Sequence, residues 1–140
     1  MDANANRVLE GLRVCEEILR LHWSAPRQFR AVRALRHAVA AGLRTSPAGT
    51  AARLAARHSR TDVGRTAVAG RVASLAQLLL INFQRAKEAL RVLEECSRLN
   101  APRAVRVFQR LRFRTYQVEQ HVLHDLASLR HPRSLRRRRP

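Results

Sequence analysis

Apolar residues recur at helical spacing along most of the 140-residue chain. Val8, Leu12, Cys15 and Leu19 form one such stripe, and similar stripes run through the later segments. Residues three and four apart lie on one face of an α-helix, so this spacing predicts amphipathic helices. Since no segment alternates apolar and polar residues as a half-buried strand would, we expect an all-α fold, a compact bundle of about five helices.

Helix-breaking and capping residues divide this pattern into separate helices. Asp2 is the expected N-cap of the first helix, Pro26 fits the first turn of the second, and Pro102 ends the fourth. The expected helices cover residues 3–22, 26–41, 51–58, 68–98 and 103–129. We expect one domain over residues 1–129 and a disordered Arg-rich tail over residues 130–140, dispensable for folding and catalysis.

The net charge is the most informative feature of the composition. The formal net charge is +18, and Lys87 is the only lysine among 28 basic residues. A charge of this size is typical of proteins with polyanionic partners, and the tail is expected to bind polyanions nonspecifically. The near absence of lysine is also what a coding bias toward arginine would produce.

The remaining composition predicts a cytoplasmic protein. No run of 18 apolar residues is present, so no transmembrane helix is expected, and the N-terminus does not have the pattern of a signal peptide. Cys15 and Cys96 sit inside helical patterns and form neither a CxxC pair nor a metal-ligand cluster. Free thiols in a reducing compartment are the expected state.

One segment of the chain occurs twice. Residues 4–21 read NANRVLEGLRVCEEILRL and residues 82–99 read NFQRAKEALRVLEECSRL, with 10 of 18 positions identical. Most of the matches are polar, whereas a repeat kept only for packing should preserve its apolar residues. The repeat predicts two equivalent helices that pack against each other around an approximate two-fold axis.

Six of the ten acidic residues lie inside this repeat. Pairing with Arg three or four residues away on the helix surface is the simpler explanation for several of them. Asn4 and Glu16, however, fall within or beside the apolar stripe, and Asn82 and Glu94 take the same places in the second copy. A half-buried carboxylate needs a partner, so we expect a cleft between the repeat helices, lined by Asn, Arg and Glu from both.

Four segments also carry a family likeness over about residues 2–125. They read DANANRVLEGLRVCEE (2–17), RHSRTDVG (57–64), NFQRAKEALRVLEE (82–95) and RFRTYQVE (112–119). In this order they resemble the alternative hydroxymethylpyrimidine phosphate kinase, a small helical domain that is unrelated to the ribokinase fold and often precedes thiamine phosphate synthase. The resemblance implies transfer of the γ-phosphoryl group of ATP to hydroxymethylpyrimidine phosphate in thiamine biosynthesis, and such a transfer usually needs Mg²⁺. His58 departs from it, because Asp is expected there.

The residue types suit this reaction. An acceptor that is already a phosphate monoester needs positioning and charge neutralisation more than a strong base, and Arg binds phosphate bidentately. The candidate catalytic residues are Arg91, Arg13, Glu94 and Glu16. The candidate residues for the substrate and ATP are Asn4, Arg7, Glu10, Asn82, Arg85, Glu88 and Arg57. Asp62 is the candidate Mg²⁺ contact, with a turn or N-cap aspartate as the alternative.

Other functions stay open at this point. A nucleic-acid-binding helical protein is favoured by the charge and opposed by an even spread of Arg and by the repeat glutamates, which repel phosphate. A catalytically silent regulatory partner of thiamine phosphate synthase is kept open by His58. The phosphate-binding motifs GxxxxGK[ST] and GxGxxG are absent, so ATP would be bound by Arg side chains and helix N-termini. ATP and the pyrimidine phosphate are the expected ligands, and the synthase and a homodimer remain open as partners.

Overall fold

The computed structural model describes residues 1–45, 50–55 and 70–130. Within these ranges the chain is all-α and contains no strand, which confirms the predicted fold class. The elements are α1 (Asp2–Glu17), a single π-helical turn η1 (Ile18–His22), α2 (Pro26–Arg44), α3 (Thr50–Ala55), α4 (Leu75–Asn100) and α5 (Pro102–Arg130). No helix of the described part is long and apolar enough to span a membrane.

Two helix starts differ from the sequence prediction. α4 begins at Leu75 and not near residue 68, because Ser74 caps it and accepts a hydrogen bond from the Gln77 amide at 3.1 Å. Met1, and not Asp2, occupies the N-cap position of α1. Asp2 lies in the first turn, where its negative charge still interacts favourably with the helix dipole.

α2 ends at Arg44 and not at residue 41 as expected, because it continues through Gly42, a residue type that often follows the end of a helix. A Cβ atom at Gly42 would lie 2.9 Å from Leu111 Cδ1 and 3.1 Å from Val107 Cγ1, both on α5. The glycine therefore serves the close packing of α2 on α5, and the helix ends at Arg44. α3 begins at Thr50, and the expected helical residues after Ala55 lie outside the described residues.

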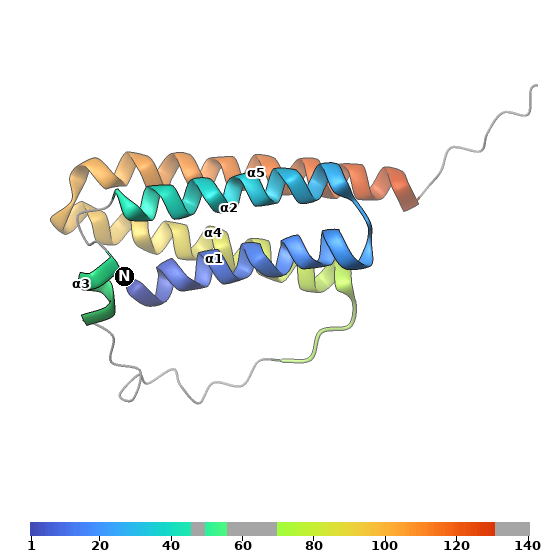
Figure 1. The fold of residues 1–140 in the computed structure, drawn as a ribbon, viewed down its shortest axis with the longest axis horizontal. Coiled ribbons are helices and arrows are strands. Elements are labelled where there is room, and N and C mark those ends of the chain that lie inside the picture. The colour runs from blue at the N-terminus through green and yellow to red at the C-terminus, as the bar shows by residue number, and fades with distance from the viewer. Residues whose placement is uncertain (46–49, 56–69, 131–140) are drawn as a thin grey trace, which may run out of the picture.

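The four long helices form a bundle of two antiparallel hairpins, α1–η1–α2 and α4–α5 (Figure 1). α1 packs against both α2 and α4, and α5 packs against both α4 and α2. α1 and α4 carry the sequence repeat, and they run side by side in opposite directions (Figure 1). This arrangement confirms the predicted packing of the two repeat helices around an approximate two-fold axis.

The repeat extends into the second helix of each hairpin. Residues 26–36 and 102–112 share Pro, Arg, Arg, Leu and Arg at the same relative positions, so Arg36 is equivalent to Arg112. The two helices also bury equivalent positions, Val32 and Leu35 in α2 and Phe108 and Leu111 in α5. The repeating unit is therefore a whole hairpin and not only its first helix.

α1 and α4 are in close contact at Gly11. A Cβ atom added there would lie 2.9 Å from the backbone oxygen of Asn82. Around this contact the four long helices bury a continuous apolar core, whose largest fully buried side chains are Phe83, Phe108, Leu12, Leu19, Leu35, Leu79, Leu90 and Leu93. Burial of this apolar surface is the main source of stability, and it leaves the polar repeat residues at the seams between helices.

Candidate functional site

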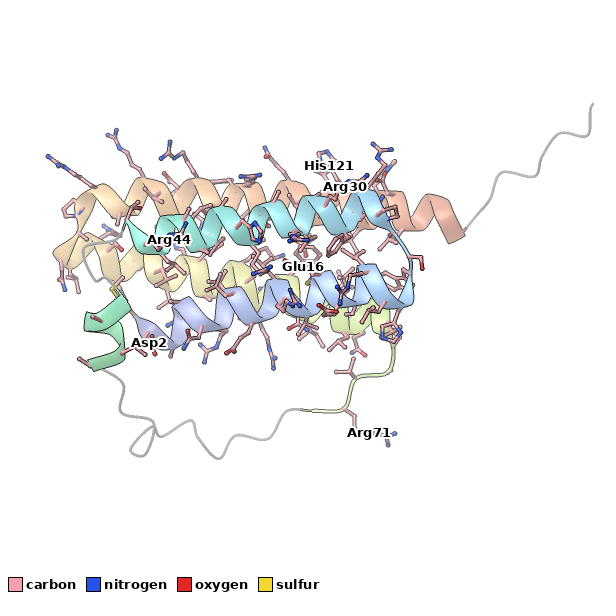
Figure 2. The ribbon with its side chains drawn as sticks, viewed as in Figure 1. Asp2, Glu16, Arg30, Arg44, Arg71 and His121 are labelled. Carbon is pink, nitrogen blue, oxygen red and sulfur yellow. The ribbon has the colours of Figure 1, made fainter. Side chains whose placement is uncertain are left out.

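Glu16 of α1 is almost completely buried, with 1% of its surface exposed, in the layer between α1 and α2 (Figure 2). Arg36 of α2 binds both carboxylate oxygens, through Nε to Oε1 and through Nη2 to Oε2 at 3.3 Å. Arg13, one turn earlier on α1, reaches Oε2 at 3.5 Å. A buried carboxylate is costly unless it is paired, and the bidentate guanidinium of Arg36 meets that need.

Glu94 of α4 repeats this arrangement in the second hairpin. Arg112 of α5 donates from Nε to Oε2 at 2.9 Å and from Nη2 to Oε1 at 3.4 Å, and Arg91 donates to Oε1 at 2.9 Å. The hydrogen bond to Glu94 raises the pKa of Arg112, and a further one to Tyr116 acts in the same direction. Glu16 and Glu94 are therefore equivalent in their partners as well, because each binds an arginine on the second helix of its hairpin.

A second carboxylate extends each of these groups toward solvent. Glu17 lies between Arg13 at 2.8 Å and Arg20 at 2.9 Å. In the second hairpin Arg91 binds Glu95 at 2.6 Å, and Arg98 binds it at 2.8 Å. The hydrogen bond from Arg98, followed by the charge of Arg91, lowers the pKa of Glu95. We call these groups the N-terminal cluster (Arg36, Glu16, Arg13, Glu17, Arg20) and the C-terminal cluster (Arg112, Glu94, Arg91, Glu95, Arg98).

The predicted cleft between the two repeat helices is not what the structure forms. α1 and α4 approach too closely at Gly11, and the buried Asn82 side chain donates to the Leu78 carbonyl of its own helix at 2.8 Å. Asn4 is only half-buried and accepts a hydrogen bond from Arg7 at 3.1 Å. The two buried carboxylates, Glu16 and Glu94, are instead divided between two seams, α1/α2 and α4/α5, one in each hairpin.

The remaining candidates are distributed over the surface or lie outside the described residues. Arg85 and Glu88 line a shallow pocket of about 500 Å³ on α4, together with Gln84 and with Glu119 of α5. Glu10 is exposed on α1. Three residues singled out from the sequence lie outside the described residues: Arg57, His58 and Asp62.

The two hairpins differ beside their clusters. In the C-terminal hairpin Lys87 Nζ lies 2.7 Å from Glu119 Oε2, and both side chains are largely buried, with 14% and 13% of their surface exposed. The ammonium group also lies 5.2 Å from the centre of the Tyr116 ring, within cation–π range. The equivalent positions of the N-terminal hairpin hold apolar residues, Leu9, Leu43 and Ala40. At these three positions, therefore, the C-terminal hairpin has charged and aromatic groups where the N-terminal hairpin has apolar side chains.

The model of the ThiD2 family matches residues 1–121. The chain belongs to the ThiD2 family. It is also similar to three proteins named thiamine-phosphate synthase: it is 34% identical to that of Nostoc sp. over 123 residues, 32% to that of Nostoc punctiforme over 123 residues, and 35% to that of Synechocystis sp. over 126 residues. Each match covers 88% of this chain and 34–35% of the relative, so the chain spans about a third of their length. No solved structure matches it.

The C-terminal cluster of this ThiD2 domain holds an exposed cation in a fixed position. Arg91 is 53% exposed, yet two carboxylates hold its guanidinium in place. Donors that are fixed before the ligand binds need little rearrangement to stabilise charge on a phosphoryl group. Within the described ranges no three His, Cys, Asp or Glu residues lie close enough together to hold a metal. Cys15 is no nucleophile, because burial, helped by the charge of Glu119, raises the pKa of its thiol well above the usual range.

Four important residues of this ThiD2 domain were not singled out from the sequence: Arg36, Arg112, Lys87 and Glu119. Arg36 and Arg112 could have been found from the sequence, because residues 26–36 recur at 102–112 and these two arginines occupy equivalent positions. Lys87 and Glu119 lie inside segments that carried the family likeness, but their contact joins α4 to α5 and has no local sequence signal.

Proposed function

We propose that this ThiD2-family domain is a phosphotransferase of thiamine biosynthesis. It transfers the γ-phosphoryl group of ATP to 4-amino-5-hydroxymethyl-2-methylpyrimidine phosphate and yields the pyrimidine diphosphate and ADP. The match to the ThiD2 family and the similarity to proteins named thiamine-phosphate synthase support the context of thiamine biosynthesis. The reaction itself is supported by the resemblance of the four segments and by the chemistry of the C-terminal cluster.

The reaction needs charge neutralisation rather than a strong base. A phosphate oxygen of the acceptor attacks the γ-phosphorus, and the bond from that phosphorus to the bridging oxygen of ADP breaks. The acceptor oxygen is already ionised near neutral pH, so no proton has to be removed before the attack. Catalysis then depends on positioning the two phosphates in line and on stabilising charge on the transferred group.

The main structural support for this proposal is the guanidinium of Arg91, which is exposed but held in a fixed position. Glu94 and Glu95 fix it at 2.9 and 2.6 Å, while about half of the side chain stays open to solvent. We assign Arg91 to the transferred phosphoryl group, and Lys87 and Arg112 to the electrostatic field around it. The C-terminal hairpin is favoured over its copy, because its copy holds Leu9 where Lys87 stands.

Magnesium enters this proposal only with ATP. The described residues contain no cluster of three metal ligands, so they do not fit a resident metal centre. Asp62, the candidate Mg²⁺ contact, lies outside the described residues and stays a prediction. No step of the mechanism is assigned to a protein-bound metal.

Substitution of Arg91 tests the proposal. Arg91→Ala should lower kcat/KM by about 10²-fold or more, which corresponds to about 2.7 kcal/mol. Arg91→Lys should recover little, since an ammonium group cannot make the planar two-point contact of a guanidinium. The free energy of unfolding should fall by less than about 1 kcal/mol, because the ion pairs of this half-exposed side chain are screened by water.

Arg20→Ala is the matched control. Arg20 is 50% exposed and binds Glu17 at 2.9 Å, but it belongs to the N-terminal cluster. Its removal should leave kcat/KM within about threefold of wild type. Near-wild-type turnover in Arg91→Ala would remove this residue from the site, and equal losses in the two variants would point to a general effect of charge.

A second candidate function is a catalytically silent partner domain of thiamine-phosphate synthase. The relatives that bear this name are about three times as long as the matched segment, and His58 stands where the family likeness leads us to expect Asp. A pull-down of the synthase by this domain, with no ADP release from ATP and the pyrimidine phosphate, would favour this function over the kinase.

A further inference from the structure

Charge is divided unequally between the two layers of the bundle. α1 with η1 carries three arginines against four acidic residues, and α4 carries four basic against three acidic residues, so their layer is neutral. α2 carries five arginines and no acidic residue, and residues 102–127 of α5 carry five arginines against two acidic residues. Residues 26–44 of α2 and 102–127 of α5 together therefore have a formal charge of +8, in contrast to the neutral layer formed by α1, η1 and α4.

Most arginines of this layer are available to a ligand. Two of them, Arg36 and Arg112, point inward to the buried glutamates. The other eight are exposed and have no carboxylate partner in the part of the chain that the structure describes. They are Arg33, Arg44 and the six that form a row along the bundle, Arg27, Arg30, Arg103, Arg106, Arg110 and Arg114. Figure 2 shows long basic side chains along the edge formed by α2 and α5, where Arg30 and His121 are labelled. We call this surface the α2/α5 face.

The six arginines form one row along the bundle. Gln28 near the start of α2 donates to Asp125 near the end of α5 at 2.7 Å, which aligns these ends of the antiparallel helices. Arg27 and Arg30 therefore continue the row that begins at Arg103. At 1.5 Å per residue the row spans about 34 Å, close to one turn of a B-form duplex.

We propose that the α2/α5 face binds the phosphate backbone of a nucleic-acid duplex without reading its bases. Guanidinium groups form bidentate contacts with phosphate, and a row of them without carboxylates gives affinity but no sequence information. The repeat glutamates, which would repel phosphate, lie in the other layer and not on this face. Of the two acidic residues of α5, Asp125 accepts a hydrogen bond from Gln28, and Glu119 is paired with Lys87.

An acidic protein surface fits this face less well. Stable protein interfaces bury a cluster of large apolar or aromatic anchors at their centre. Among the described residues no large exposed hydrophobic side chain lies on α2. The two on α5, Phe113 and Tyr116, are near Arg112 and Lys87, on the side that faces α4. A partner without need of apolar contacts therefore suits the face best.

The salt dependence of duplex binding by the full chain tests this inference. The probe is a fluorescent DNA duplex of about 20 base pairs, titrated by anisotropy between about 50 and 200 mM salt. Three arginines of the row are replaced together, Arg30→Gln, Arg106→Gln and Arg110→Gln. Loss of three phosphate contacts should weaken binding at least about tenfold at about 100 mM salt and reduce the slope of log K against log salt by about 2 to 3.

The control removes three arginines from elsewhere, Arg20→Gln, Arg71→Gln and Arg98→Gln. This control variant has the same net charge as the triple Gln variant of the row and keeps the same C-terminal arginines. Its affinity for the duplex should fall by less than about threefold. A triple Arg→Lys variant of the row should retain most of the salt slope, which shows that the face is folded and charged. Equal losses in the two Gln variants, or tighter binding to polyglutamate than to the duplex, would overturn the inference. No step of this test uses ATP turnover, so its outcome is independent of the proposed kinase activity.

Discussion

The two buried ion pairs, Arg36–Glu16 and Arg112–Glu94, provide a matched pair of perturbations. Arg36→Ala and Arg112→Ala each remove the bidentate partner of a glutamate that is at most 5% exposed. Breaking a buried ion pair from one side costs about 3–5 kcal/mol, because the remaining charge is left in a poor environment. Each glutamate keeps a second donor, Arg13 at 3.5 Å or Arg91 at 2.9 Å. We therefore expect a loss of about 2–4 kcal/mol from either substitution.

Urea unfolding followed by circular dichroism measures this loss. For a domain of this size, about 3 kcal/mol should lower Tm by roughly 10 °C. Replacing both members of a pair by leucine, as in Glu94→Leu with Arg112→Leu, should recover much of the stability, because no buried charge is then left unpaired. A loss below about 1 kcal/mol in both alanine variants would show that these carboxylates do not depend on Arg36 and Arg112 for their stability in the buried position.

We expect Arg36→Ala and Arg112→Ala to have similar effects on stability but different effects on activity. Arg112 lies beside Arg91 and Lys87, so its removal should lower kcat/KM by at least about tenfold when measured well below the lowered Tm. Arg36 belongs to the N-terminal cluster, where Leu9, Ala40 and Leu43 leave no equivalent site. Arg36→Ala should stay within about threefold of wild type under the same conditions. The opposite order of losses would move the proposed site to the N-terminal hairpin.

Three further predictions concern packing, reactivity and pH. Gly11→Ala should destabilise the protein by about 1–3 kcal/mol in chemical unfolding, because the new Cβ atom would meet the backbone of α4. Gly42→Ala should cost less, because the new Cβ atom would meet only flexible side-chain ends that can move. Equal effects of the two substitutions would contradict the close helix contact at Gly11. Iodoacetamide should modify the half-buried Cys96 in the native protein and spare Cys15 until denaturant is added, and equal native rates would argue against the buried thiol. Because the pKa of Glu95 is lowered in the folded protein, its ion pairs stabilise the fold above the ordinary pKa of 4.5, and this stabilisation is lost as the pH falls below that value. The difference in Tm between wild type and Glu95→Gln should therefore persist at neutral pH and disappear in acid.

The fold could be predicted because its signals are local or repeated. Stripes such as Val8, Leu12, Cys15 and Leu19 specify helices by their spacing, and the recurrence of residues 4–21 at 82–99 required two equivalent helices in contact. Helix ends were less predictable. Gly42 indicated a stop, but packing against Leu111 overrides this signal, and the start of α4 depends on the single cap of Ser74.

The candidate site could be predicted only in part. The sequence identified Glu16 and Glu94 as carboxylates that need partners, and their burial agrees with that expectation. It placed the partners across the wrong pair of helices, since a repeat shows which residues are equivalent but not which neighbour each one faces. Arg36 and Arg112 sit on the second helix of each hairpin, and only the three-dimensional arrangement brings them to the glutamates.

The proposed kinase activity can be measured as ADP release by the purified full chain. ATP is supplied with hydroxymethylpyrimidine phosphate, with the unphosphorylated alcohol, or with no acceptor, and phosphorus NMR follows the products. We expect ADP only with the phosphorylated acceptor, in equal amount to a new pyrimidine diphosphate, and a loss of both products in Arg91→Ala. ADP release that is the same with and without acceptor, or no release in any of the three reactions, would contradict the proposed kinase activity.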